Sequence, residues 1–136
     1  MDITDCIFCK IISKEIPSKI INEDENFLCF LDIQPHALGH SVVIPKKHAD
    51  DIFDLSKELQ NKLIPFVKLS MEKINTVLHP DGFNVGWNNG VAAGQVVPHL
   101  HVHIFPRYKN DTGGNMHSII NEPIKMSVVE VAKLFK

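Results

Sequence analysis

The chain has 136 residues, of which 44% are hydrophobic and 22% are charged, and its formal net charge is −2. This length is enough to bury one hydrophobic core, so we expect residues 1–136 to form a single domain. The small net charge and the lack of a basic run argue against binding of nucleic acid through bulk charge. No apolar run reaches the roughly 20 residues that a membrane helix needs, so no membrane partner is expected.

The first ten residues, MDITDCIFCK, contain two aspartates and lack the apolar centre of a signal peptide. The chain has three cysteines, an odd number, and their spacing is not that of a disulfide scaffold. Together these features predict a protein of the reducing cytoplasm.

The first part of the chain is rich in short elements. Residues 11–17, IISKEIP, are typical of a short helix that Pro17 stops. Residues 20–22 and 27–32 are apolar and are separated by a polar turn, which predicts a hairpin. SVVIP, residues 41–45, follows Gly39 and reads as a buried strand.

Residues 50–78 form the main helical region. Its apolar stripe at three- and four-residue spacings is predicted to contain Ile52, Leu55, Leu59, Leu63, Phe66, Leu69, Lys73 and Val77. Pro65 falls inside this pattern and is expected to kink or divide the helix.

Two more strands are predicted at residues 83–87 and 99–106, with the small-residue loop NNGVAAGQ between them, and residues 128–135 predict a short terminal helix. Hairpins and short connections favour antiparallel pairing. The sequence therefore predicts an α+β fold, with a mainly antiparallel five-stranded sheet, one long helix and one or two short helices against it.

The stretch HLHVHIF places histidines at every second position, His99, His101 and His103. In a strand these side chains share one face, while Leu100, Val102 and Ile104 face the core. Three alternating histidines are a costly choice for an ordinary exposed face, so a functional role is favoured over chance. Neutral imidazole can be a metal ligand, or a nucleophile and hydrogen-bond donor, and the pattern alone leaves both open.

The same stretch resembles the motif that names the histidine triad, or HIT, family of nucleotide hydrolases and transferases. CIFCKIISKEIP, FLDIQPHALGHSVVIPKKH and GWNNGVAAGQ are similar to the other blocks of that family and stand in the same order. The resemblance covers residues 5–107, about three quarters of the chain. It implies the HIT-like fold and a zinc-containing branch of bacterial type.

By this resemblance His101 is the nucleophile, which attacks the α-phosphorus of a nucleotide and forms a covalent nucleotidyl-histidine. His103 would hydrogen-bond a phosphoryl oxygen, and His40 is a fourth histidine near the phosphate. The third histidine of the motif is Gln in a nucleotidyl-transferase branch, so His103 favours hydrolysis.

The resemblance also implies the nucleotide-binding residues. Asp32 would accept hydrogen bonds from the ribose hydroxyls, although without the resemblance it reads as a turn residue. Asn88 and Gln95 would contact the phosphates, or serve only the turn. The base would lie in an apolar slot, which is otherwise simply core, made by Ile7, Phe8, Ile11 and Phe30.

One position departs from the family pattern. Well-known members carry Ser or Thr directly after Gln95, near the leaving group, whereas this chain has Val96. The substrate is therefore expected to be a purine nucleoside phosphoramidate or a dinucleoside polyphosphate, and the sequence does not separate the two. The tail from Lys109 onward matches no block and is a second place where substrate choice can reside.

Cys6 and Cys9 form a Cys-x-x-Cys pair, which alone is half of a zinc site. A redox pair of the thioredoxin kind needs a strand before it and a helix after it, and that context is missing. The zinc-containing branch of the family uses two such cysteines, a His after Pro-Lys-Lys and the first triad His. Those positions are Cys6, Cys9, His48 and His99, which predicts a closed, structural Zn²⁺.

Two other functions compete with the hydrolase. One is a catalytic metalloenzyme with all three triad histidines on one metal, and the other is a nucleotide-binding partner protein with weak hydrolase activity. Family members of this length pair as homodimers, so the resemblance also implies a homodimer.

Overall fold

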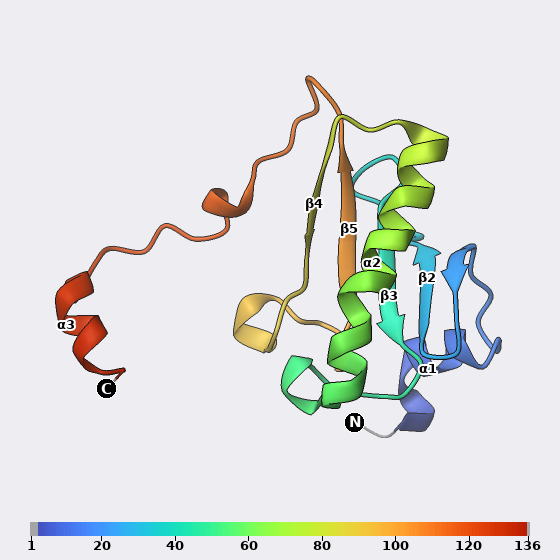
Figure 1. Ribbon diagram of the computed structural model, residues 1–136, viewed down its shortest axis with the longest axis horizontal. Coiled ribbons are helices and arrows are strands. Elements are labelled where there is room, and N and C mark those ends of the chain that lie inside the picture. The colour runs from blue at the N-terminus through green and yellow to red at the C-terminus, as the bar shows by residue number, and fades with distance from the viewer. Residues whose placement is uncertain (1–2, 136) are drawn as a thin grey trace.

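The computed structural model describes residues 3–135, and Figure 1 shows a twisted sheet crossed by one long helix. The strands are β1 (Ile20–Glu23), β2 (Phe27–Leu31), β3 (Ser41–Pro45), β4 (Gly82–Gly86) and β5 (Val102–Arg107). The helices are α1 (Ile7–Ile12), α2 (Lys57–Leu78) and α3 (Val128–Lys133), with short 3-10 turns at Ile3–Asp5, Ile52–Asp54, Val91–Ala93 and Met116–Ser118. The predicted α+β fold is confirmed.

The five strands form one sheet in the order β1-β2-β3-β5-β4, and every neighbouring pair is antiparallel. The predicted hairpin is β1 and β2. β5 inserts between β3 and β4, and Val42 of β3 lies opposite His103 of β5. This pairing brings His40, which directly precedes β3, beside the histidine motif.

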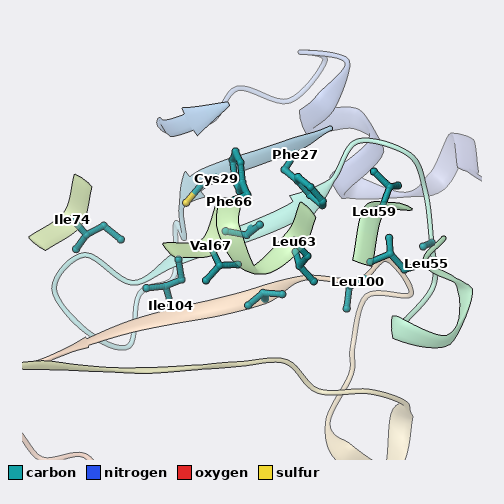
Figure 2. Close-up of a cluster of buried hydrophobic side chains, with 13 residues drawn as sticks. Phe27, Cys29, Leu55, Leu59, Leu63, Phe66, Val67, Ile74, Leu100 and Ile104 are labelled. Atoms are coloured by element: carbon teal, nitrogen blue, oxygen red, sulfur yellow. The ribbon is translucent and has the colours of Figure 1, made fainter. Parts of the chain in front are cut away.

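α2 packs on one face of the sheet and builds the larger core (Figure 2). Its buried residues are Leu59, Leu63, Phe66, Val67, Ser70 and Ile74. The predicted stripe was wrong after Phe66, since Leu69 is 54% exposed and Val77 is 73% exposed. After Phe66 the buried face continues at steps of four through Ser70 and Ile74, because the helix repeat of 3.6 residues rotates Leu69 away from the sheet.

Pro65 does not divide α2, which runs without a break from Lys57 to Leu78. Proline in a helix interior removes one backbone hydrogen bond and costs about 3 kcal/mol. Phe66 and Val67 beside it are both 3% exposed, and Leu63 is equally buried. Burial of each such side chain contributes about 1.5–3 kcal/mol, which offsets the cost of the proline. The predicted start at Asp50 was also wrong, because Ile52–Asp54 is a separate turn and Ser56 caps α2.

α1 begins and ends earlier than the predicted helix at residues 11–17. The Cys6 sulfur accepts the backbone N–H of Cys9 and caps the first turn, and Lys14 adopts a φ of 69° just after the helix end. Phe8 and Ile11 of α1 pack against the other face of the sheet, with Leu28, Phe30, Val42 and Ile44. The sheet is thus covered by α2 on one face and in part by α1 on the other.

The ladder of β5 begins at Val102, three residues later than predicted. Pro98 has no N–H, and the N–H of Leu100 donates to the carbonyl of Ala49 in a loop, 2.8 Å away, so this piece pairs outside the sheet. Leu100, Val102 and Ile104 are nevertheless buried, as the alternation predicts.

The tail after β5 leaves the sheet, and residues 109–135 are exposed throughout. Figure 1 shows the tail reaching away from the body to α3, the terminal helix that the sequence predicts. That the tail shares one domain with the sheet stays a prediction. Within residues 3–135, no helix has the length and apolar character needed to cross a membrane.

Candidate active site

His101 lies just before β5, with its ring fixed by one hydrogen bond. Its Nδ1 is 2.8 Å from the carbonyl oxygen of His99. A carbonyl only accepts, so Nδ1 carries the hydrogen and Nε2 keeps its lone pair. The ring of Phe8 packs 5.0 Å away, centroid to centroid. The fold therefore orients the His101 ring so that the Nε2 lone pair is the one left unbonded.

His40 and His103 form a hydrogen-bonded pair beside His101. The backbone N–H of His36 donates to His40 Nδ1 at 3.2 Å, so the His40 hydrogen is on Nε2. That Nε2–H is 2.9 Å from His103 Nδ1, which must then accept. The remaining hydrogen of His103 is therefore on its Nε2, available as a donor to a phosphoryl oxygen.

Burial keeps both rings neutral. It lowers the pKa of His103 to about 4, with further lowering from the neighbouring His101 and His40. The pKa of His40 is also lowered, first by burial, although the Asp32 carboxylate opposes the shift. The hydrogen bonds from His36 to His40 and from His40 to His103 require both rings to be neutral.

Phe105 completes the arrangement, although sequence patterns had not assigned a role to it. Its ring is stacked on His103 at 5.4 Å and 16° and lies 4.2 Å from the His40 ring. Phe105 is two residues after His103 on β5, so period two alone would have placed it on the same face. It fixes both imidazoles by packing.

A cavity of about 660 Å³ opens next to His40 and His103. Asp32, at the end of β2, lies at its edge, with Oδ2 3.6 Å from His40 Nε2. The floor is made by β5 and β4, and a far wall comes from the tail, which includes Gly114 and Met116.

A second group of side chains, Cys6, Cys9, His48 and His99, converges on one point behind His101. The distances between their ligand atoms are 3.3 Å for Cys6 to His99, 3.3 Å for Cys9 to His48, 3.6 Å for Cys9 to His99 and 3.1 Å for His48 to His99. Zinc bonds of about 2.3 Å to sulfur and about 2.0 Å to nitrogen give tetrahedral edges of roughly 3.3–3.8 Å. The four atoms are spaced close to that tetrahedron.

The hydrogen bonds around this group also fit a metal ion. His99 Nε2 is 2.9 Å from the carbonyl of Pro45, and His48 Nε2 is 2.8 Å from Asp50 Oδ1. Both rings therefore carry their hydrogen on Nε2, and two bare Nδ1 atoms face each other. Two acceptors at 3.1 Å repel unless they share a cation. Burial and the adjacent Cys6 raise the pKa of the Cys9 thiol to about 11, so a thiolate pair at this place requires a neighbouring positive charge such as a metal ion.

Comparisons with known proteins identify the family. The model of the HIT domain matches residues 13–110. An uncharacterised HIT-like protein of Methanocaldococcus jannaschii is 47% identical over 106 residues, which cover 78% of this chain and 81% of that protein. The chain belongs to the HIT family. Cys6 and Cys9 lie before the matched residues, so the match itself says nothing of the cysteine pair.

Two further HIT proteins match nearly the whole chain. Adenosine 5'-monophosphoramidase hnt1 of Schizosaccharomyces pombe is 38% identical over 135 residues, covering 96% of this chain and 98% of that protein. The crystal structure of a HIT family protein from Bacillus anthracis superposes with a TM-score of 0.83 at 37% identity, covering 96% of this chain and 92% of that one. The likeness therefore includes the tail as well as the HIT domain.

The predicted base slot is partly assembled in this HIT domain. Phe8, Ile11 and Phe30 are 8%, 8% and 4% exposed and pack together, whereas Ile7 is 46% exposed and lies outside the cluster. Three of the four residues are thus core in this structure, and their contact with a base stays a prediction.

The two predicted amide contacts are placed differently. Asn88 lines the cavity beside His103. The Gln95 side chain is already engaged, because its Oε1 accepts the N–H of Gly90 at 2.8 Å and its Nε2 donates to the carbonyls of Asp50 and Val97. Gln95 holds the loop in shape here, and its phosphate contact stays a prediction. Val96 next to it is 89% exposed.

The three triad histidines do not converge on one metal. His99 faces the cysteines, whereas His103 groups with Asp32 and His40. That second group is poorly suited to a cation, since His40 Nε2 carries a hydrogen as long as Nδ1 accepts from His36. The sequence could not reveal this role of His36, because the group that determines the His40 tautomer is a backbone N–H.

Proposed function

We propose that this HIT protein is a nucleotidyl hydrolase that acts at the α-phosphate of a purine nucleoside phosphoramidate. The observation that carries the proposal is the fixed lone pair of His101 Nε2 beside the free Nε2–H of His103. One atom is prepared to attack and the other to donate, and burial keeps the His103 ring neutral near pH 7. The name of the Schizosaccharomyces pombe relative is in line with this chemistry.

The reaction would take two displacements. His101 Nε2 attacks phosphorus and a nitrogen–phosphorus bond forms. The leaving amine departs with the electron pair of its own bond to phosphorus and takes a proton from solvent. The positive charge that develops on the His101 ring is stabilised by its Nδ1–H on the His99 carbonyl. Water then attacks phosphorus, loses a proton to solvent, and restores the lone pair of His101 as the nucleoside monophosphate leaves.

The charge of the cavity favours an amine over a second nucleotide as the leaving group. Among the described residues that line it, Arg107 is the cation, and Asp111 engages its guanidinium through two hydrogen bonds. Asp32 adds a negative charge at the edge. A departing polyphosphate would bring several negative charges without a free cation to meet them, whereas an amine brings none.

Asp32 at the end of β2 is proposed to hold the ribose, and Ile7, Phe8, Ile11 and Phe30 to face the base. His40 positions His103. Cys6, Cys9, His48 and His99 would hold one Zn²⁺, which supplies a structural tie between the N-terminal segment and the loop before β5. The closed set of four candidate ligands supports membership in the zinc-containing branch of the family.

Two further parts of the proposal concern the state of the protein. The thiols that a zinc site needs persist in a reducing compartment, which supports the cytoplasm. Apolar residues on the outer face of α2 and along the tail support a homodimer, since Ile64, Val77, Ile124 and Phe135 are 62%, 73%, 88% and 84% exposed.

Purified protein should hydrolyse adenosine 5'-phosphoramidate faster than diadenosine tetraphosphate, and acid-quenched mass spectrometry should locate an adenylyl group on His101. If protein that contains one zinc ion per chain turned over neither substrate, the proposed hydrolase function would be wrong. Tight binding of the monophosphate with only very slow turnover would favour a nucleotide-binding partner protein instead.

A further inference from the structure

Arg107 hydrogen-bonds the part of the C-terminal segment that lines the cavity, whereas Tyr108 Oη and the Lys109 N–H bind Leu38 and Asp81 nearer the start of the tail. Arg107 is the last residue of β5 and shares a face with His103 and Phe105. Its Nε and Nη2 donate to the two carboxylate oxygens of Asp111 at 2.9 Å and 2.7 Å, and its Nη1 donates to Asn84 Oδ1 at 2.6 Å. Nη1 also donates to the carbonyl of Gly114.

Asp111 is also hydrogen-bonded by backbone N–H groups of its own turn. Its carboxylate accepts the backbone N–H of Tyr108 at 3.0 Å and that of Gly113 at 3.0 Å. Together with the Arg107 hydrogen bonds these hold the pKa of Asp111 well below its usual range. Residues 107–114 therefore form a closed turn around an ion pair, which we call the Arg107 clasp.

Gly113 shows how closely the turn is fitted to the guanidinium. A Cβ at this position would lie 2.6 Å from Arg107 Nη2 and 2.8 Å from Cζ, so the backbone lies directly on the group. Within residues 3–135, the bond from Arg107 to Gly114 is the last hydrogen bond from the tail to the sheet; those further along are local. The segment that follows, Gly113–Ile119, supplies the far wall of the cavity.

We propose that Arg107 is a positioning residue that sets the leaving-group specificity of the enzyme, by holding the Gly113–Ile119 wall in the cavity that His103 also lines. This role rests on the proposed function. The wall offers Met116 and Ile119, and Trp87 and Phe105 line the sheet side, so the pocket takes an amine with an apolar or aromatic substituent. A small leaving group such as ammonia does not reach the wall.

The test compares two adenosine 5'-phosphoramidates, one that releases ammonia and one that releases tryptamine. Arg107→Met keeps the unbranched apolar stem, although not the full length of the side chain, and removes all of its hydrogen bonds. It should raise KM for the tryptamine substrate about tenfold with kcat changed much less, and its effect on the ammonia substrate should be several-fold smaller. Arg107→Lys, which keeps the charge but not the fork, should lie between Arg107→Met and wild type.

A second readout follows the wall itself. Amide hydrogen exchange across Gly113–Ile119 should be at least about tenfold faster in Arg107→Met than in wild type. Lys62→Met is the matched control, because Lys62 pairs with Glu58 on the exposed face of α2, away from the cavity. It should leave exchange in the wall as in wild type.

The outcomes separate the two levels of the proposal. Failure of the wild-type protein to hydrolyse either phosphoramidate would overturn the proposed function. An equal rise of KM for both substrates in Arg107→Met, or unchanged exchange across the wall, would overturn only the role of Arg107.

Discussion

His40 Nε2 lies 2.9 Å from His103 Nδ1, and this contact determines which nitrogen of His103 faces the cavity. The direction of this hydrogen bond is set by a third residue, because the backbone N–H of His36 donates to His40 Nδ1 and leaves the His40 hydrogen on Nε2. A peptide N–H cannot change its role with pH in the way that an imidazole can. The tautomer of His103 is therefore fixed through two rings by the main chain, as long as both rings stay neutral.

The first prediction concerns acid. A His in the unfolded chain keeps a pKa of about 6.5, whereas burial lowers the pKa of folded His103 to about 4. Between about pH 4 and pH 6.5, His103 is therefore protonated in the unfolded chain but neutral in the folded chain. The stability associated with neutral His103 is therefore complete above about pH 6.5 and is lost as the pH falls toward about 4.

Urea unfolding at pH 7 and pH 5, with excess zinc, measures this loss. The wild type should lose about 1 kcal/mol more than His103→Gln over that interval, after allowance for the partial exposure of the ring. Asp32, His36, His40 and His101 remain in both proteins, so their titration largely cancels in the difference. Equal losses in the two proteins would contradict the assigned pKa of His103.

The second prediction concerns the nucleophile. His101→Ala should lower kcat by about 10⁴-fold or more, because no other group presents a lone pair at that place. It should still bind adenosine monophosphate, and no adenylyl group should be trapped on the protein. His117→Ala, at an exposed histidine of the tail, is the control and should keep full activity. Turnover that survives His101→Ala would show that another residue attacks phosphorus.

Much of this arrangement could be predicted from sequence patterns, for identifiable reasons. Five strands and the long helix follow from short apolar runs and from spacings of three and four residues, which reported burial correctly as far as Phe66 in α2 but not at Leu69 and Val77. The alternation of Leu100, Val102 and Ile104 correctly placed them in the core. It did not show that the strand begins only at Val102, because Leu100 bonds to a loop residue far away in sequence.

The parts that sequence patterns missed depend on the backbone or on distant packing. His36 acts through its N–H, so its side chain carries no signal. Phe105 looks like an ordinary strand residue until His40 is brought beside it by the β3–β5 pairing. Gln95 has the right chemistry for a phosphate, but the loop uses its whole amide. Such choices are decided by three-dimensional neighbours, which residue type alone cannot specify.

The third prediction concerns the metal. Cys9→Ser should lower the bound zinc from one per chain to well below one, and should reduce the melting temperature by more than about 10 °C. Asp50→Asn should bind zinc about 10- to 100-fold more weakly, because the hydrogen bond that orients His48 is weakened. Cys29→Ala, which alters the third cysteine in the core under α2, should retain one zinc. Full zinc in Cys9→Ser would rule out the proposed ligand set.

The fourth prediction concerns the turn that delivers His40. Gly39 has a φ of +86°, and an added Cβ would overlap Leu78 Cδ1 and lie 3.3 Å from Pro106 Cγ. Gly90 has a similar φ of +95° with no atom within 4 Å of an added Cβ, so it is a matched control for backbone strain alone. Gly90→Ala should cost about 1 kcal/mol of unfolding free energy, and Gly39→Ala about 1–3 kcal/mol more, because α2 must move or Leu78 must leave its rotamer. Urea denaturation of the two variants measures the difference. Equal losses of unfolding free energy would show that the Leu78 side chain can move aside without cost.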